Sequence, residues 1–117
     1  MAELKLMRAV DVAAEEIRQE GAEKVSLRWL ISKRDGAPSF AMRLFEVGAG
    51  GCSPLHRHGW EHEVYILEGK GELDYEGQRL EFEAGYFILV PPGREHRFRN
   101  TGPGGLKFLC LVPNDSY

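Results

Sequence analysis

The stretch Gly50-Gly-Cys-Ser-Pro-Leu-His-Arg-His-Gly-Trp-Glu-His-Glu-Val-Tyr-Ile-Leu-Glu-Gly69 decides how this sequence folds, because it gathers three of the chain's four histidines. Side chains two residues apart on an extended strand project to the same face, so His56 and His58 point the same way. The Gly-Trp-Glu segment that follows can turn the chain and bring His62 back beside them. His96 lies about one hairpin further on, after a Pro-Pro-Gly turn. Imidazole is the commonest protein ligand for borderline transition metals, so the four histidines predict a metal site without thiolates.

Glycine and proline punctuate the sequence on both sides of this stretch. The 14 glycines and 6 prolines separate short runs that are apolar or alternate between apolar and polar residues. Short runs of this kind, divided by turn signals, predict an all-β sandwich or barrel. The expected strands are Val25–Ser32, Phe40–Val47, Glu63–Leu67, Gly71–Tyr75, Gln78–Phe82, Tyr86–Val90, Arg97–Asn100 and Leu106–Val112.

One segment departs from the strand pattern. The Ala, Glu, Ile and Gln residues of Val12–Gln19 favour a helical turn, or a loosely held arm. The sequence has no linker, repeat or low-complexity segment, so we expect a single domain over residues 1–117. Its barrel core is expected at about residues 38–113, with an N-terminal arm at about residues 1–23.

The composition is that of an ordinary globular domain and excludes several classes of protein. Hydrophobic residues make up 43% of the 117 residues, charged residues make up 28%, and the net charge is −3. A nonspecific nucleic-acid binder would need a basic excess, which this chain lacks. The sequence holds no apolar run long enough for a signal peptide or a membrane span, and Cys52 and Cys110 form no CxxC motif. We therefore expect a cytoplasmic protein with no nucleic-acid or membrane partner.

Alternation along two of the expected strands makes both of their faces apolar. Tyr65 and Leu67 lie on the face opposite to the histidine side of one strand, and Leu109 and Leu111 lie on the second face of another. A half-buried strand should have one polar face. Either these residues belong to the core of a sandwich whose faces are assigned the other way round, or they pack against a second subunit. We expect the second arrangement, a homodimer.

The spacing of glycine, histidine and proline resembles the cupin superfamily. The first cupin motif reads Gly, five residues, HxH, three or four residues, Glu, six residues, Gly; the second reads Gly, five residues, PxG, two residues, His, three residues, Asn. Residues that match the first motif are Gly50, His56, His58 and Gly69, and residues that match the second are Gly85, Pro91, Gly93, His96 and Asn100. The two motifs with the loop between them cover residues 50–100.

The chain departs from the cupin pattern at the glutamate ligand. The residue that leaves the required spacing before Gly69 is His62, and Glu63 lies one position further on, on the opposite face of the strand. The resemblance therefore implies that the ligands are His56, His58, His62 and His96.

Flanking sequence narrows the resemblance to small four-histidine, manganese-binding cupins of thermophilic bacteria. The similar segments are His56–Glu63, Phe40–Phe45 before it and Phe108–Pro113 after it. Those proteins commonly have proline where this chain has Gly59, so we expect the loop that carries His62 to be less rigid here.

This resemblance implies a double-stranded β-helix, or jelly roll, with one divalent transition metal per chain and a tight homodimer. Manganese is expected from the resemblance alone, because ligand softness would favour Zn²⁺, Fe²⁺, Ni²⁺ or Cu²⁺. Four neutral ligands leave a divalent ion its full charge, which should strengthen its Lewis acidity and lower the pKa of bound water. A closed tetrahedral zinc site is the structural alternative.

Strand parity extends the expected site into a pocket. The expected lining residues are Phe45, Trp60, Val64, Ile66, Phe98, Phe108 and Cys110. We expect Cys110 to act as a small buried hydrophobe rather than as a reactive thiol. Apart from metal-bound water or O₂, no catalytic acid or base stands out. Arginines that could bind an anionic substrate are Arg43, Arg57, Arg94 and Arg97, although solvated outer-face charges are the better interpretation of Arg57 and Arg97.

These observations favour a metal-dependent oxidoreductase of dioxygenase type that acts on a small apolar or enolic substrate. Two alternatives remain. One is an isomerase or hydrolase that uses the ion as a Lewis acid without redox chemistry, and the other is a non-enzymatic sensor of a small molecule or metal. The cupin fold supports all three, so the fold does not choose among them.

Overall fold

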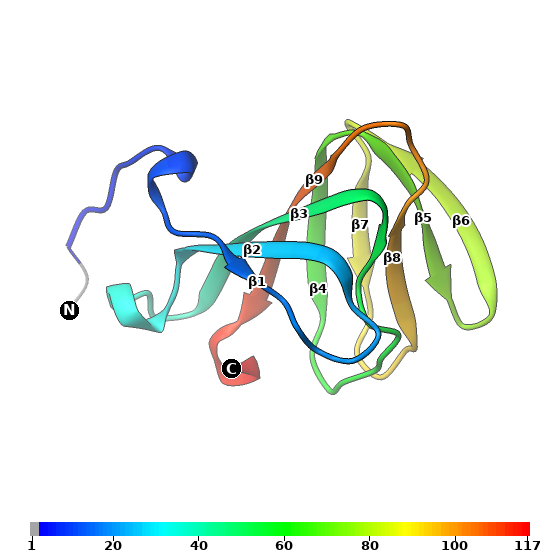
Figure 1. The fold of residues 1–117 in the computed structure, drawn as a ribbon. Helices are drawn as coiled ribbons and strands as arrows, with labels where there is room; N and C mark the ends of the chain where they lie inside the picture. The colour runs from blue at the N-terminus through cyan, green and yellow to red at the C-terminus, as the bar shows by residue number, and fades with distance from the viewer. Residues whose placement is uncertain (1–2) are drawn as a thin grey trace.

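The computed structural model describes residues 3–117, which form a curled antiparallel sheet without any α-helix (Figure 1). Each of the eight expected runs forms a strand, and the all-β prediction is confirmed. The strands are β1 (Glu15–Glu16), β2 (Glu23–Ile31), β3 (Phe40–Cys52), β4 (His62–Glu68), β5 (Lys70–Tyr75), β6 (Gln78–Glu83), β7 (Phe87–Val90), β8 (His96–Asn100) and β9 (Leu106–Pro113). Short 3-10 turns lie at Ala9–Asp11, Lys33–Asp35 and Asn114–Ser116.

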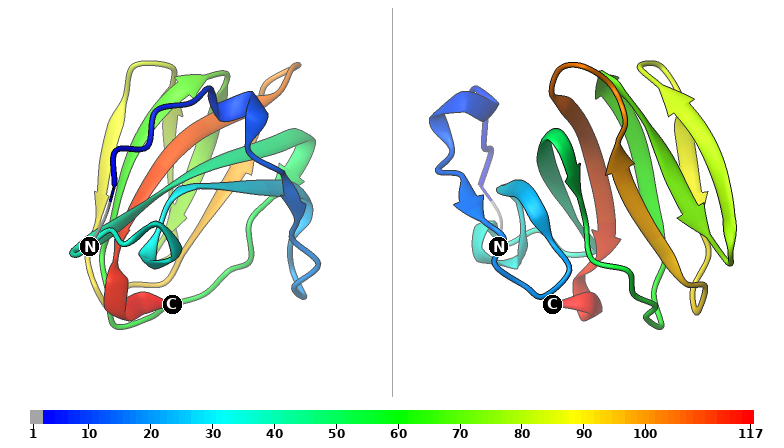
Figure 2. Two further views of the ribbon diagram at one scale, coloured as in Figure 1. Left: turned by 90° about the vertical axis from the view of Figure 1, so that its left-hand side faces the viewer. Right: turned by 45° about the vertical axis from the view of Figure 1, so that its right-hand side comes forward.

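The long strand β3 connects the two halves of the barrel. The strand order is β6-β5-β8-β3-β9-β4-β7. Outside this path, β2 pairs with β3, and β1 pairs with β2. Most of β3 pairs with β9, from Phe40 opposite Pro113 to Val47 opposite Leu106, whereas its last residue, Cys52, pairs with Arg99 on β8. Figure 2 shows the sheet curling around its own interior, as in a jelly roll.

Apolar side chains from both halves meet inside the curled sheet. Phe98 on β8 stacks on Phe108 on β9, with their ring centroids 4.9 Å apart, and Phe82 on β6 packs edge-on against Phe98. Ile66 on β4 and Leu106 on β9 are fully buried in the same cluster. The aromatic part of this packing borders the histidines, because the Phe98 ring lies 6.3 Å from the His96 ring between centroids.

The second cupin motif acts through a turn and an asparagine. Gly93 has a φ of 76°, which suits glycine, and its N–H donates to the carbonyl of His58 over 2.7 Å. Asn100 is buried, and its amide nitrogen donates to the carbonyls of Val47 and Gly104. The motif therefore fixes the loops around the histidines as well as supplying His96.

The segment 12–19 is not helical, so the expectation of a helical turn there was wrong. Glu15 and Glu16 instead form β1 against Leu27 and Ser26, and the N–H of Ile17 donates to the carbonyl of Val25 over 2.9 Å. Ile17 packs against the core, which gives this otherwise exposed stretch its anchor. The arm expected over residues 1–23 thus includes a strand, and its residues 1 and 2 lie outside the described part of the chain.

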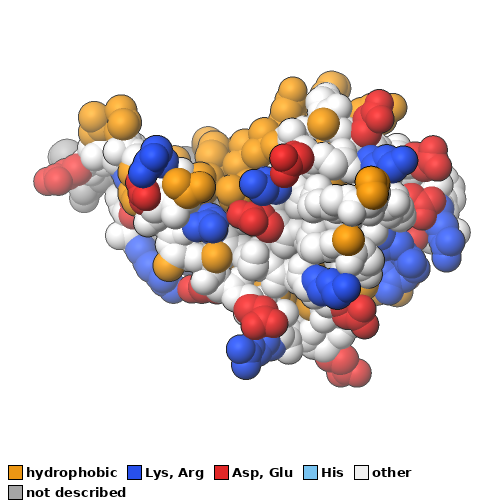
Figure 3. All heavy atoms as spheres, turned by 45° about the horizontal axis from the view of Figure 1, so that its top comes forward, with side chains coloured by type: hydrophobic (Ala, Val, Ile, Leu, Met, Phe, Trp, Pro, Cys, Tyr) orange, Lys and Arg blue, Asp and Glu red, His pale blue; other side chains and the backbone are white. Residues whose placement is uncertain are grey.

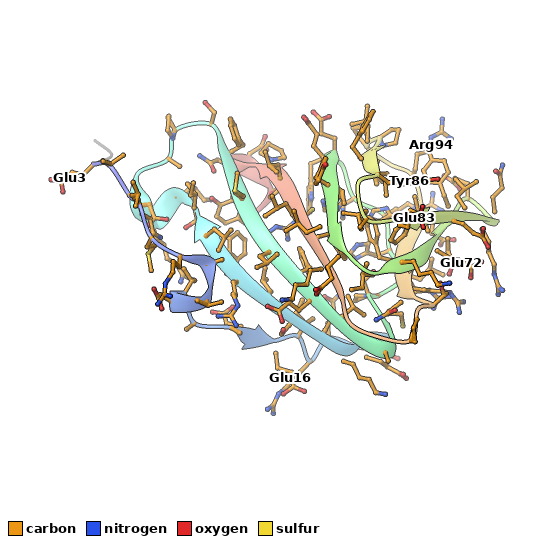
Figure 4. All side chains as sticks on the ribbon, turned by 90° about the horizontal axis from the view of Figure 1, so that it is seen from above. Glu3, Glu16, Glu72, Glu83, Tyr86 and Arg94 are labelled. Atoms are coloured by element: carbon orange, nitrogen blue, oxygen red, sulfur yellow. The ribbon has the colours of Figure 1, made fainter. Side chains whose placement is uncertain are left out.

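Charged side chains lie on the surface at the end of the molecule that carries β5 and β6 and at the edge next to β1 (Figure 4). Viewed from above, Glu72, Glu83 and Arg94 extend outward at the end of the molecule that carries β5 and β6, and Glu16 extends from the edge next to β1 (Figure 4). No helix among residues 3–117 is long and apolar enough to cross a membrane.

Candidate metal centre

Three loops or strand ends bring the four histidines together. His56 and His58 lie on the loop between β3 and β4, His62 begins β4, and His96 begins β8. The backbones of His56 and His96 are joined by two hydrogen bonds, of 3.1 and 2.9 Å. One possible ligand atom from each of the four side chains lies within 4.8 Å of all the others.

Hydrogen bonds to the far side of two rings aim the remaining nitrogens at the centre of the cluster. Nδ1 of His58 lies 3.1 Å from the carbonyl of Trp60, and Nδ1 of His96 lies 2.8 Å from the carbonyl of Arg94. A carbonyl can only accept, so these rings carry a proton on Nδ1 and present an unprotonated Nε2. Such partners commonly orient histidines that bind metals.

The donor set fits a divalent transition metal. Nε2 of His96 is buried and has no hydrogen-bond partner among the described residues, as expected of an atom that needs a ligand. Nε2 of His62 and Nε2 of His58 are 2.8 Å apart. Metal–nitrogen bonds of about 2.1 Å place two opposite ligands about 4.2 Å apart, close to the 4.8 Å span of the cluster.

Burial keeps these imidazoles neutral near pH 7. It lowers the pKa of His56 to about 4 and the pKa of His62 to about 2, with smaller contributions from the other histidines and Arg43. The pKa values of His58 and His96 are also lowered, mainly by burial. Neutral imidazole is the form that binds metals, so protons compete little with a metal ion here.

The strand parity that distinguished His62 from Glu63 agrees with their positions. His62 is buried with 7% exposure and points into the barrel, whereas Glu63 is exposed and pairs with Leu89 and Leu111 on the outer side. Glu63 lines a hollow on the outer surface and is not part of the histidine cluster.

A cavity of about 310 Å³ opens beside the histidines. Its lining includes Phe45, Phe98, Phe108 and Cys110, all from the expected pocket set. Phe45 stacks on Phe108 with their centroids 5.2 Å apart, so the wall next to the cluster is aromatic.

Three other expected pocket residues do not line this cavity. Val64 and Ile66 lie further along β4, paired with Cys110 and Phe108, and are buried in the core. Trp60 stacks on the His58 ring, with an interplanar angle of 3° and a centroid distance of 4.1 Å. Parity gave the correct face for the two β4 residues but not their depth below the cavity.

Of the four arginines that the sequence offered for an anionic substrate, Arg43 lines the cavity. It alternates on β3 with Phe45 and Val47, which also line the cavity, so parity places it on the same face as Phe45. Its Nη2 donates to Sγ of Cys110 over 3.1 Å and lies 3.4 Å from Nδ1 of His62.

Cys110 contacts both of those groups. Its Sγ lies 3.1 Å from Nδ1 of His62, and burial raises the pKa of the thiol. The sulfur is therefore a buried neighbour of the histidine cluster and is poorly suited to act as a free nucleophile.

The remaining arginines and Cys52 lie outside the cavity. Arg57 and Arg94 are exposed, and Arg97 pairs with Asp74 on β5. Cys52 ends β3, and its thiol lies 3.5 Å from the carbonyl of Gly21. None of these residues reaches the histidine cluster.

The N-terminal segment contributes to the mouth of the cavity, which the sequence did not predict. Ile17 and Gln19 line the cavity beside Val25 and Leu27 of β2. The apolar residue in an otherwise charged stretch was the available signal, because a lone isoleucine between glutamates and an arginine needs a buried contact.

Comparison with known proteins identifies the family. The family model described as "Cupin domain" matches residues 43–112, which include all four histidines and most of the cavity-lining strands β3 and β9. The chain belongs to the cupin family. Together with the four-histidine cluster, this match confirms the resemblance to small metal-binding cupins.

Relatives of this cupin have diverse names. It is 30% identical over 113 residues to the oxalate-binding protein of Thermotoga maritima, with 92% of each chain covered. It is 42% identical over 72 residues to 1-methylthio-D-xylulose 5-phosphate methylsulfurylase of Rhodospirillum rubrum, where the match spans 61% of this chain and 46% of that protein. The chain thus covers less than half the length of the second relative.

Among solved structures, the polyketide cyclase RemF from Streptomyces resistomycificus is similar over almost the whole cupin. The TM-score is 0.89 and the identity 37%, and the match covers 95% of this chain and 80% of that one. The cyclase, the sulfurylase and the oxalate-binding protein differ in what their names describe, so family membership leaves the reaction open.

Proposed function

We propose that this cupin is a metal-dependent enzyme that acts on a small apolar or enolic substrate, and that its reaction is an oxidation of dioxygenase type. The observation that carries the proposal is the position of the four-histidine cluster, three of whose neutral imidazoles line an aromatic-walled cavity of about 310 Å³. Ligand pockets typically measure roughly 300–1,000 Å³, so the substrate is small.

His56, His58, His62 and His96 would hold the ion. A divalent ion bound by four neutral ligands keeps its full charge and supplies Lewis acidity, and a redox-active one also supplies electron transfer. We propose manganese, with zinc, iron, nickel and copper as the alternatives that metal analysis separates.

The chain's own residues would bind and orient the substrate. Phe45, Phe98 and Phe108 offer flat apolar surfaces that are already stacked on one another, so they hold a planar substrate without rearranging. Ile17 and Gln19 at the mouth would limit the access of water.

A second candidate function is favoured by the likeness to the polyketide cyclase. A cyclase, isomerase or hydrolase would use the same site as a Lewis acid, with no need for oxygen. A non-enzymatic sensor is the third candidate, and it predicts ligand retention without turnover.

Oxygen uptake tests the proposal. Protein loaded with manganese is mixed with a flavonol or an enolic 1,3-diketone, in air and under strict anaerobiosis, beside His58→Ala as the variant with an incomplete cluster. We expect oxygen uptake and loss of the enol absorbance only in air and only with the wild type. Loss of the enol that continues without oxygen or with zinc would transfer the assignment to the non-redox candidate, and binding without turnover would favour the sensor.

We also propose that a second copy of the chain covers the outer face of β4, β7 and β9. A hollow of about 420 Å³ there is lined by apolar residues that include Tyr65, Leu89 and Leu111. Phe87 at its border is 82% exposed and Leu89 is 60% exposed. Figure 3 shows hydrophobic side chains, coloured orange, gathered on the surface between the N-terminal arm and the barrel. Apolar patches of this kind commonly mark interfaces.

We propose a cytoplasmic location as well. Cys52 and Cys110 are both free thiols, which is the state that a reducing compartment maintains.

A further inference from the structure

Arg43 carries a charge that nothing described in the chain neutralises. Arginine is protonated at every accessible pH. The half-buried arginine Arg28 on the neighbouring strand pairs with Glu46 at 3.3 Å, whereas no carboxylate among residues 3–117 forms an ion pair with Arg43. Its Nε is buried without a hydrogen-bond partner.

The surroundings of Arg43 add no negative charge. Its guanidinium carbon lies 4.9 Å from the ring centroid of Phe45 and 5.5 Å from that of Trp29. Its polar contacts are the Cys110 thiol and Nδ1 of His62. The cavity lining contains no aspartate and no glutamate. Arg43 is half-buried, and withdrawing part of a cation from water is unfavourable unless an anion pairs with it.

The Arg43 guanidinium adjoins the histidine cluster through the ring of His62. Arg43 contacts one nitrogen of the His62 ring, and the other nitrogen of that ring lies 2.8 Å from Nε2 of His58 inside the cluster. The cavity therefore has a polar region, where an uncompensated guanidinium contacts the His62 ring of the cluster, and it also has aromatic walls.

We propose that Arg43 is the anion-binding residue of this cavity, and that its ligand is a small apolar acid with one anionic oxygen group, a carboxylate or an enolate. The anionic oxygen pairs with the guanidinium while the hydrocarbon part packs on Phe45 and Phe108. This inference deepens the proposed function, because the same ligand would be the substrate at the metal centre. A guanidinium suits such a group because its N–H donors form charge-assisted hydrogen bonds to an anionic oxygen, and with a carboxylate they can contact both oxygens at once.

A competing role for Arg43 is purely structural. Its contacts with Cys110 and His62 could orient the His62 ring without any bound anion. The two roles differ in one measurable property. Only anion binding makes the affinity for a ligand depend on the ligand's charge.

Isothermal titration with benzoate and its neutral analogue benzamide measures that property. We expect metal-free wild-type protein to bind benzoate about tenfold or more tightly than benzamide, since hydrogen bonds between two charged groups are stronger than those to a neutral group. Arg43→Met should reduce this preference to within about twofold. Arg28→Met, which removes a paired guanidinium outside the cavity lining, should keep the wild-type preference.

A second pair of probes distinguishes an enolate ligand from a carboxylate ligand. 4-Nitrophenolate, a stable stand-in for an enolate, is compared with neutral 4-nitroanisole. A larger charge preference in this pair than in the benzoate pair identifies the enolate class, and the reverse identifies the carboxylate class.

Three results would overturn the inference: equal affinity of the wild type for charged and neutral probes, an unchanged preference in Arg43→Met, or an equal loss in Arg28→Met. If Arg43→Met does not fold, Arg43→Lys and the wild-type measurement still decide, because lysine lacks the two-point contact and should weaken benzoate binding. The metal-free arm is independent of turnover. Charge preference without turnover would refute the proposed function alone, and turnover without charge preference would refute this inference alone.

Discussion

Where β4 and β9 pass the histidine cluster, both of their faces depart from what an antiparallel sheet usually presents. Ordinarily the inner face is apolar and the outer face polar. Here His62 and Cys110 bring polar atoms inward next to the Arg43 charge, while Tyr65 and Leu109 place apolar surface outward. Each face therefore has unmet interactions. The inner one suits ions and charged ligands, and the outer one suits another apolar surface.

The largest effect that tests the inner face is loss of metal in His62→Ala. We expect about one metal per chain in the wild type and almost none in the variant, because the fourth nitrogen and the contact with His58 are both removed. Mass spectrometry of tag-free protein measures the metal content. The matched control is Glu63→Gln, which alters the next residue on the outer face and should leave the metal content unchanged. Full metal in His62→Ala would mean that another group replaces this ligand.

The next effect tests the outer face. Phe87→Glu places a charge on the most exposed aromatic side chain of that surface, so we expect a wild-type dimer to become a monomer. Sedimentation velocity measures the change. Leu80→Glu, at a side chain of 46% exposure on β6, is the control that should remain dimeric. A monomeric wild type would contradict the proposed interface.

A smaller effect is the pH dependence of the folding stability of the metal-free protein, which tests the histidines of the inner face. The pKa of folded His56 is about 4 and that of His62 about 2, against about 6.5 when unfolded. Below about pH 6.5 the unfolded chain therefore binds more protons than the folded one, so stability is fully present above that pH and falls as the pH drops toward about 4. Urea denaturation of metal-free protein should show this slope, and His56→Gln should reduce it. A pH-independent midpoint would contradict the neutral cluster.

The smallest expected effect is a gain in stability at the ligand loop. Gly59 has no atom within 4 Å of an added Cβ and no positive φ, so Gly59→Ala should stabilise the protein by about 0.4–1 kcal/mol by restricting the unfolded chain. Gly77→Ala is the matched control, because that site is equally open but has a φ of 82°, and alanine there should destabilise. Urea midpoints of both variants measure the difference, and a loss of stability in Gly59→Ala would show that the loop needs its freedom.

Short-range pattern was enough to predict the strands and the histidine cluster. Turn residues such as Glu76-Gly77, where both φ values are positive, delimit strands by local sterics that are readable in sequence. His62 could be distinguished from Glu63 because strand parity is also local.

What the sequence did not reveal depends on the curvature of the sheet. Parity placed Val64 and Ile66 on the inner face, but their depth in the core follows from how β4 meets β9. Ile17 reaches the cavity only because β1 folds back on β2. The sequence could not separate Arg43 from the three other candidate arginines, because the absence of a carboxylate partner is a property of the assembled cavity.

The two tryptophans lie beside different polar groups of the site, so their fluorescence can report on each group separately. Trp60 lies flat on the His58 ring, and Trp29 lies beside the Arg43 guanidinium. Replacing one of them with phenylalanine leaves a single indole emitter next to either the imidazole cluster or the cation. The intrinsic fluorescence of the two single-tryptophan proteins would then follow metal loading and anion binding as separate signals, without any added dye.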